Sequence, residues 1–295
     1  ELTRRAKDGE LTILASVLAR SGPRAVEALR RELTSKPPDD SGEASKEELA
    51  RQRANAAVAL CHLGSSQELW PLLAATPDPR LRTFLIHKLP AAAVDPGPLA
   101  ERLRTETDPG VRRAILWTLG KYEMRLLGLR RGEELAGAIL EIFVHDPDPG
   151  VHSAAEWLLR QWGQKERLAA AEDALAREGI RDDRLWFVTP QRHTFAIVRG
   201  PTTFSMGSSV GDPDRRREEP LHEERIAWTY AIATKELTGR QFRAALGDRK
   251  SNSSTDDFPE SRTDMTDLMA YCRRLSEQER SEEHTSELQS RFGIS

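Results

Sequence analysis

Asp108-Pro-Gly-Val-Arg112 and Asp148-Pro-Gly-Val-His152 are two copies of one short pattern, and Asp78-Pro-Arg-Leu-Arg82 is a third. Each copy has the form Asp-Pro-x-apolar-basic and stands at the start of an apolar segment with helical spacing. An Asp side chain can accept hydrogen bonds from the free amides of a first helical turn, and Pro fits there because that amide has no partner to lose. The pattern therefore predicts three helices that begin in the same way.

The ends of the helices match as well. Leu60-x-x-Leu63-Gly64, Leu116-x-x-Leu119-Gly120 and Leu159-x-x-Trp162-Gly163 each place glycine directly after the last apolar position. Glycine is favoured there because it readily adopts the left-handed conformation that closes a helix. The three Asp-Pro copies are 30 and 40 residues apart, which is at or below the lower end of the roughly 40 to 47 residues usual for repeated helix pairs.

Shorter apolar segments lie between these helices, and the residues that we expect to form partner helices are 67–75, 98–104, 133–144 and 165–177. Neither helix of a pair can bury its apolar face alone, so stacking the pairs into a short solenoid is the expected arrangement. Residues 46–178 therefore resemble HEAT repeats. Two alternatives stay open for them: a surface that binds a protein partner, and a helical domain that packs without one.

Residues 1–45 are predicted to be a helical lead-in followed by a linker. One apolar stretch lies around residues 11–18, and a second follows Pro23, with Val26, Leu29 and Leu33 at helical spacing. Pro is accepted in the first turn of such a helix. Residues 35–45 are rich in Pro, Asp and Ser, which predicts a solvated loop.

The composition excludes several classes of protein. The chain has 295 residues, of which 38% are hydrophobic and 31% charged, which is ordinary for a soluble chain of two domains. A net charge of -3 gives no overall attraction to nucleic acid or to an anionic membrane. No apolar run approaches the roughly 18 residues of a membrane span. Cys61 and Cys272 lack the spacing of a zinc site or a disulfide framework, so we expect a reducing, cytoplasmic location.

Six arginines of the helical region could be described as a basic stripe for a phosphate backbone. They are Arg51, Arg53, Arg80, Arg82, Arg112 and Arg113. Acidic residues alternate with them and no aromatic platform is interleaved in the sequence, so we expect a solvated face on which they pair with neighbouring carboxylates. Trp117, Trp157 and Trp162 are predicted to occupy core positions of their helices.

The character of the sequence changes after Gly179, and we place a domain boundary at residues 178–184. Short β-favouring runs, separated by turns, follow at residues 185–188, 194–198, 203–206, 222–226 and 228–232. Thr238 is predicted to cap a helix over residues 239–246. A second helix is predicted over residues 266–276, with Leu268, Met269, Cys272 and Leu275 on its apolar face. Within the strands, Met206 is expected to fill a core and Gly207 to allow close approach of the backbone.

Four short motifs in this half form a recognisable series. They are Thr194-Phe-Ala-Ile-Val-x-Gly200, Phe204-x-Met-Gly-Ser208, Glu219-Pro-Leu-His222, and Ala231-Ile-Ala-Thr-Lys-Glu-Leu-Thr238 followed by Gln241-Phe242. The series resembles the opening of a formylglycine-generating, or sulfatase-modifying-factor, domain, and residues 267–276 are similar to the next helix of that family. The resemblance covers residues 185–279, roughly the first third of such a domain. It implies an incomplete C-type-lectin-like α+β domain, which would follow the helical, HEAT-like domain of residues 46–178.

The resemblance implies chemistry that lies in a later part of the family domain. Members of the family oxidise a sulfatase cysteine to formylglycine with copper held by a cysteine pair, and relatives use non-haem iron. Neither that cysteine pair nor the family's Arg-Leu-Pro-Thr-Glu segment occurs in this sequence, and Cys272 lies in the earlier helix. We therefore assign no catalytic, cofactor-binding or metal-binding residue. His193 and His222 lack further ligands at metal spacing and are expected to be structural or exposed.

Two functional hypotheses follow. The first is that the chain is an inactive part of a larger bacterial protein whose intact domain is a metal-dependent oxidase that uses copper or iron. The alternative is a binding or scaffold region, without catalysis, of a serine/threonine-kinase signalling protein. Arg280-Ser-Glu-Glu-His-Thr-Ser-Glu-Leu-Gln-Ser290 resembles a translated sequencing adapter, so residues 280–295 are expected to be an artefactual or disordered tail.

Overall fold

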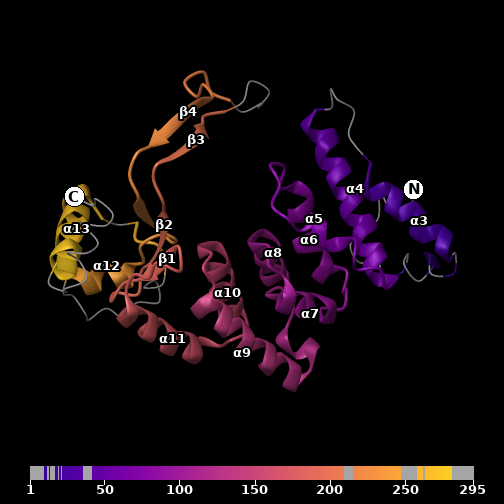
Figure 1. Ribbon diagram of the computed structural model, residues 1–295, viewed down its shortest axis with the longest axis horizontal. Helices are drawn as coiled ribbons and strands as arrows, with labels where there is room; N and C mark the ends of the chain where they lie inside the picture. Colours follow the sequence, from indigo (N-terminus) through magenta and orange to yellow (C-terminus); the bar gives the residue numbers. More distant parts are fainter. Residues whose placement is uncertain are drawn as a thin grey trace. The chain divides into compact units, whose positions relative to one another are not determined.

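The computed structural model (Figure 1) divides the chain into two compact units, Glu1–Ala169 (unit 1) and Ala170–Ser295 (unit 2). The residues that it describes are 10, 11, 13, 17, 18, 20, 22–35, 42–208, 215–246, 258–261 and 263–280. Helices and small antiparallel sheets make up the described residues, so the coarse α+β class is confirmed. The division between the units falls within a helix, ahead of the 178–184 boundary expected from the sequence.

The regular elements described in unit 1 are all helices. They are α3 (Pro23–Leu33), α4 (Glu43–His62), α5 (Leu69–Leu72), α6 (Arg80–Ala91), α7 (Gly97–Thr105), α8 (Pro109–Leu119), the 3-10 helix η1 (Met124–Leu127), α9 (Leu129–His145), α10 (Pro149–Gln161) and the start of α11 (Lys165–Glu178). Helices α4, α6, α8 and α10 pack in succession and form one row, while α7 packs on α8 and α9 on α10 (Figure 1). Of the two predicted segments at residues 11–18 and 35–45, residues 12, 14–16 and 36–41 lie outside the described residues. The predicted loop is wrong for residues 43–45, which already belong to α4, where Glu and Ala favour a helix.

Two of the three helix starts follow the predicted chemistry. The Asp108 carboxylate accepts a hydrogen bond of 2.8 Å from the Val111 amide, and Asp148 does the same for Val151 at 2.8 Å. Helix α6 is different, because Asp78 binds both the backbone amide and the guanidinium of Arg80 and does not cap the helix. The prediction of three identical starts is therefore wrong for α6, where an adjacent arginine competes for the carboxylate.

The glycines at the helix ends serve two different purposes. Gly64 and Gly163 have φ values of 79° and 72°, which confirms the predicted left-handed caps. Gly120 has a φ of -66°, so the left-handed prediction is wrong for α8. A Cβ atom at Gly120 would overlap the Trp157 ring, and glycine is needed there because α10 packs so closely on the end of α8.

Gly120→Ala is expected to lower the free energy of unfolding of unit 1 by about 1–3 kcal/mol, because the added methyl group must displace Trp157. Gly137→Ala is the matched control. It lies inside α9 with nothing within 4 Å of an added Cβ, so the helix propensity of Ala should leave stability equal or higher. Chemical denaturation followed by circular dichroism measures both. Equal stability of the two variants would contradict the packing described here.

Unit 2 contains two small antiparallel sheets. Strands β1 (Trp186–Val188), β2 (Thr194–Val198) and β5 (Tyr230–Ala233) form a three-stranded sheet in the order β1-β2-β5. Strands β3 (Thr202–Met206) and β4 (His222–Ile226) form a separate hairpin, which projects away from that sheet in Figure 1. Helices α12 (Gly239–Leu246) and α13 (Met265–Arg280) pack on each other.

The predicted cap of α12 is confirmed. The Gln241 amide donates to the Thr238 hydroxyl at 3.3 Å, and the Gln241 side chain in return accepts from the Thr238 amide at 3.1 Å. This reciprocal arrangement is a capping box, which satisfies two amides at the helix start.

The apolar cluster between α12 and α13 differs from the predicted one. Phe242, Ala245 and Tyr271 are buried together, and the Tyr271 hydroxyl lies 3.3 Å from His193 Nε2. The predicted inner face of α13 is wrong for Met269, which is 60% exposed, because the helix turns Tyr271 inward to stack on Phe242. Leu268 and Cys272 are likewise exposed, and among the predicted four only Leu275 packs on this core.

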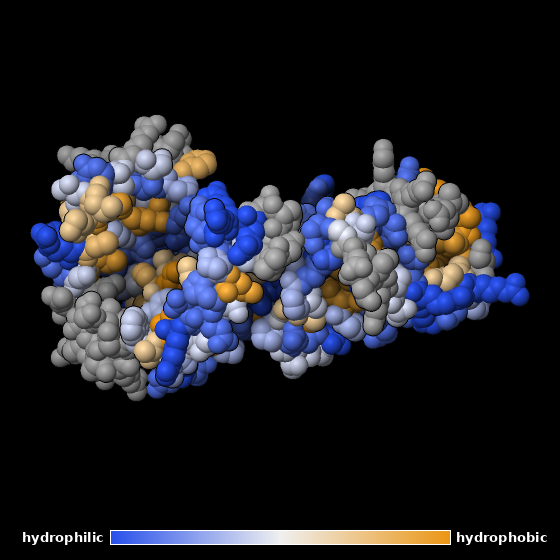
Figure 2. All heavy atoms as spheres, turned by 90° about the horizontal axis from the view of Figure 1, so that it is seen from above, coloured by the Kyte–Doolittle hydropathy of each residue, from blue (hydrophilic) through white to orange (hydrophobic). Residues whose placement is uncertain are grey.

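Apolar side chains remain on the surface of unit 2. Met206 is 52% exposed, so the prediction that it fills a core is wrong, because β3 and β4 pair only with each other among the described strands. The close approach at Gly207 is confirmed, since its φ is 101° and a Cβ atom there would overlap the Pro220 carbonyl. Hydrophobic residues reach the surface in this part of the molecule, on the left of Figure 2.

Acidification is expected to destabilise unit 2 through His193. Burial lowers the pKa of His193 below its ordinary value. The unfolded chain takes up the proton near pH 6.5, whereas the folded chain does so only at lower pH, so the unfolded state binds more protons between these values. Stability is therefore lost as the pH falls through about 6.5.

Thermal unfolding at pH 7.5 and at pH 5.5 measures this loss. His193→Gln removes the titrating group, and we expect a smaller difference between the two pH values in that variant. An unchanged pH dependence would show that His193 does not carry the effect.

Within the described part of the chain, none of the helices has the length and apolar character that crossing a membrane requires.

Candidate functional site

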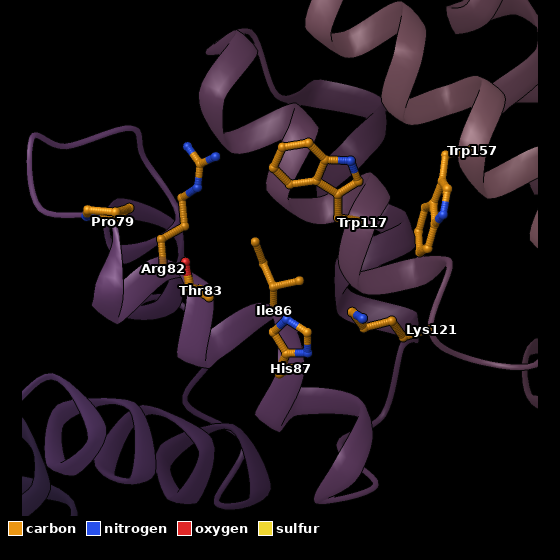
Figure 3. Close-up of a pocket in the computed structure, with 8 residues that line it drawn as sticks. All are labelled: Pro79, Arg82, Thr83, Ile86, His87, Trp117, Lys121 and Trp157. Carbon is orange, nitrogen blue, oxygen red and sulfur yellow. The ribbon is translucent and has the colours of Figure 1, made fainter. Parts of the chain in front are cut away.

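A cleft with a volume of about 330 Å³ opens across the row of helices in unit 1. Its lining comes from α6, α8 and α10 and from the residues next to α6 and α8, and consists of Pro79, Arg82, Thr83, Ile86, His87, Trp117, Lys121 and Trp157. In Figure 3, Arg82 and Ile86 project from α6 toward Trp117, and Trp157 lies at the end away from Pro79. Ile86 is buried and supplies an apolar floor.

The cleft follows from the repeated sequence pattern. His87, Trp117 and Trp157 are each the ninth residue after the Asp of their Asp-Pro copy. Because the helices start at corresponding residues and pack in one row, equivalent positions come to lie on one side of that row. Arg82 and Thr83 stand about one turn before His87 and share its face of α6.

Two tryptophans of the cleft carry cations over their rings. The guanidinium carbon of Arg82 lies 5.6 Å from the centroid of the Trp117 ring, and Lys121 Nζ lies 6.0 Å from the centroid of Trp157. Distances of this order allow a cation-π attraction. Both rings are only half-buried, and they can therefore contact a ligand as well as a cation.

The prediction that all three tryptophans occupy the core is therefore wrong for Trp117 and Trp157. Trp162 alone is buried, and its indole Nε1 donates a hydrogen bond of 3.0 Å to the Tyr122 carbonyl. Trp157 and Trp162 are five residues apart, and about 100° of rotation per residue places them on different sides of the helix axis.

Arginines of the row divide into paired and unpaired groups. Arg51 bonds Glu48 at 2.5 Å, Arg80 bonds Asp78 at 2.7 Å, and Arg112 bonds Asp146. The predicted pairing with carboxylates is confirmed for these three. Within the residues that the structure describes, Arg53, Arg82 and Arg113 have no carboxylate at ion-pair distance.

The electrostatic environment of the cleft is positive. No aspartate or glutamate lines it. Burial and the neighbouring Arg113 lower the pKa of Arg82, while Asp108 acts in the opposite direction. Since arginine stays charged in proteins, the lowered pKa reflects a partly buried charge that Asp108 offsets only in part. The site can therefore bind an anion next to an aromatic surface.

This site was not predicted because its aromatic residues and arginines are not interleaved along the chain. Arg82 and Trp117 are far apart in sequence and meet only because α6 packs on α8. The signal that could have found the cleft is the shared ninth position of His87, Trp117 and Trp157.

Two of the four motifs of unit 2 meet in the β3–β4 hairpin. Met206 pairs with His222 in the β3–β4 register, and the Ser208 hydroxyl donates a hydrogen bond of 3.0 Å to the Glu219 carboxylate. His222 is exposed, with its Nδ1 2.7 Å from the Pro220 carbonyl, whereas His193 is buried. The hairpin thus brings together the Met-Gly and Glu-Pro-x-His motifs.

Neither cysteine forms part of a reactive centre in the described structure. Burial, with a contribution from Glu68, raises the pKa of the Cys61 thiol to about 12, so this thiol stays protonated and is a poor nucleophile. Cys272 is exposed and forms no disulfide. Among the residues with a described placement, His, Cys, Asp and Glu side chains do not gather in groups of three that could hold a metal ion.

Comparison of the chain with family models, with curated proteins and with solved structures finds no match.

Proposed function

We propose that unit 1 is a HEAT-like helical array that binds a segment of a protein partner in the cleft between α6, α8 and α10. In this proposal the chain is a binding or scaffold region, of the kind that a bacterial serine/threonine-kinase signalling protein uses. The observation that carries it is the pairing of two half-buried tryptophans with two cations in one open cleft.

The residue types of the cleft favour protein recognition. Tryptophan and arginine are the side chains that most often dominate the binding energy of protein interfaces. The volume of about 330 Å³ is within the usual range for ligand pockets, enough for a few side chains of an extended segment. The successive packing of α4, α6, α8 and α10 is consistent with stacked repeats, which offer such surfaces.

Selection from a random 12-residue peptide library on the full chain tests this proposal. Peptides enriched on the unmodified protein should lose at least about tenfold in affinity for the Trp117→Ala variant, the loss expected for removing a central aromatic contact. The matched control is Trp228→Ala, which removes a tryptophan that is 64% exposed in unit 2 and should leave affinity unchanged. Peptides that bind the Trp117→Ala variant as tightly as the unmodified protein would contradict the proposed site.

A second proposal concerns unit 2, which we infer to be a sulfatase-modifying-factor-like, C-type-lectin-like domain that contributes no catalysis in this chain. The pairing of the Phe204–Ser208 motif with the Glu219–His222 motif in one hairpin supports it. The intact domain of such a protein would be a copper- or iron-dependent oxidase. Metal analysis of the purified full chain should find neither copper nor iron in stoichiometric amount, and finding either would overturn the assignment of no metal site.

A further inference from the structure

We infer that the cleft of unit 1 recognises an acidic polypeptide segment, with a carboxylate of the segment bound by Arg82 or Lys121 and an apolar or aromatic side chain against Trp117 or Trp157. This inference rests on the proposed function and specifies the chemistry of the partner. It is carried by the charge, the burial and the aromatic surfaces of the cleft.

The two cations of the cleft differ from Arg51, Arg80 and Arg112 because neither forms an ion pair within the described part of the chain. Arg51, Arg80 and Arg112 are held by carboxylates of the same chain. No carboxylate lies at ion-pair distance from Arg82 or Lys121 within the described part of unit 1. A half-buried guanidinium without an anion is unfavourable, so a ligand carboxylate would gain more here than on the solvated arginines.

The aromatic rings define the second half of the ligand. Each ring lies beside a cation, so an acidic residue and its apolar neighbour can contact the cation and the ring together. Ile86 is buried and adds an apolar surface to the lining of the cleft. Complementary charge sets which partner is accepted, while the aromatic contacts supply most of the affinity.

An acidic polypeptide fits these features better than a nucleic acid does. Nucleic-acid binding depends on many phosphate contacts made by a run of free cations. Three of the six arginines of the row are already neutralised by carboxylates, and the chain as a whole carries a net charge of -3. Two cations beside tryptophan rings are better suited to a peptide in which one or two acidic residues stand next to apolar ones.

Fluorescence anisotropy of the full chain with labelled 12-residue peptides tests the inference. One peptide contains Glu, Phe and Pro; in the second every Glu is changed to Gln, and in the third to Lys. We expect the Glu peptide to bind at least about tenfold more tightly than the Gln peptide, and its affinity to fall as the salt concentration rises. The Lys peptide should bind most weakly.

Substitutions at Arg82 test whether the preference for the Glu peptide arises in the cleft. Arg82→Gln should weaken the Glu peptide about tenfold and leave the Gln peptide unchanged, since removing one ligand-bound charge removes one charge-assisted contact. Arg104→Gln removes the same charge from an exposed position on α7 and should change neither affinity. Arg82→Lys keeps the charge and should retain the preference for Glu, which guards against a loss caused only by misfolding.

Several outcomes would overturn the inference. If the Glu and Gln peptides bound with equal affinity, and the Trp117→Ala variant bound neither, the cleft would bind peptides without preferring acidic residues. The inference would also be rejected if none of the three peptides bound, or if the Lys peptide bound most tightly. The library selection tests separately whether the cleft binds peptides at all. Tighter binding of an oligonucleotide of twelve thymidines than of the Glu peptide would identify nucleic acid as the ligand.

Discussion

Trp162→Ala should lower the free energy of unfolding of unit 1 by about 3–5 kcal/mol, the range expected for removing a large aromatic side chain from a core. Trp162 is 8% exposed, and its indole NH donates to the Tyr122 carbonyl. The variant loses the packing of the ring and leaves that carbonyl without its donor. Chemical denaturation followed by helical circular dichroism measures the change.

Trp228→Ala is the control for this prediction, because the side chain it removes lies largely in solvent. A change within about 0.5 kcal/mol is expected for such a surface substitution. If Trp162→Ala lowered the free energy of unfolding no more than Trp228→Ala, Trp162 would not join α10 to the residues that follow α8.

The second large effect concerns the β3–β4 hairpin, whose amides should exchange with solvent at least about a hundredfold faster than those of α8. A two-stranded hairpin has little stability by itself, and Phe204, at 44% exposed, buries little apolar surface. Helix α8 places Ile115, Leu116 and Leu119 fully inside the core of unit 1. Its amides therefore open only when that core is disrupted.

Hydrogen–deuterium exchange read by mass spectrometry compares the two segments in one sample. Strand β2 serves as an internal reference, because it is paired on both sides and should show intermediate protection. Protection of the hairpin equal to that of α8 would contradict the expectation that the hairpin opens more easily than the core of unit 1.

Most of the local structure could be predicted from the sequence because it depends on residues that are close together in the chain. Asp108 and Asp148 can cap a helix whatever surrounds them, and α12 has the predicted bounds because Thr238 and Gln241 satisfy each other's amides. Strands β2 and β4 likewise follow from their own β-favouring residues.

Features that depend on a distant neighbour could not be predicted in the same way. Gly120 has the sequence position of a left-handed cap, and only the approach of Trp157 reveals its actual purpose. Apolar spacing on α13 favoured Met269 as a core residue, whereas contacts with His193 and Phe242 turn Tyr271 inward. Contacts with other elements determine which face of a helix is buried when apolar spacing allows more than one.

The candidate site was not among the sequence predictions, which assigned no functional residue. Its lining comes from three helices that are adjacent only after folding, and a search along the chain separates Arg82 from Trp117. The sequence did contain the repeat that aligns the helices. The cleft becomes recognisable when the repeat is extended from its first five residues to the ninth residue after the Asp.

The most direct test of the binding site is fluorine NMR of the full chain labelled with 5-fluorotryptophan, titrated with the acidic 12-residue peptide. The six tryptophans give six resonances, which single Trp→Phe substitutions assign. We predict that the peptide shifts the resonances of Trp117 and Trp157 and leaves those of Trp162 and Trp228 unchanged. A shift of the exposed Trp228 alone, or no shift of Trp117 and Trp157 while the peptide binds, would contradict the assignment of this cleft as the binding site.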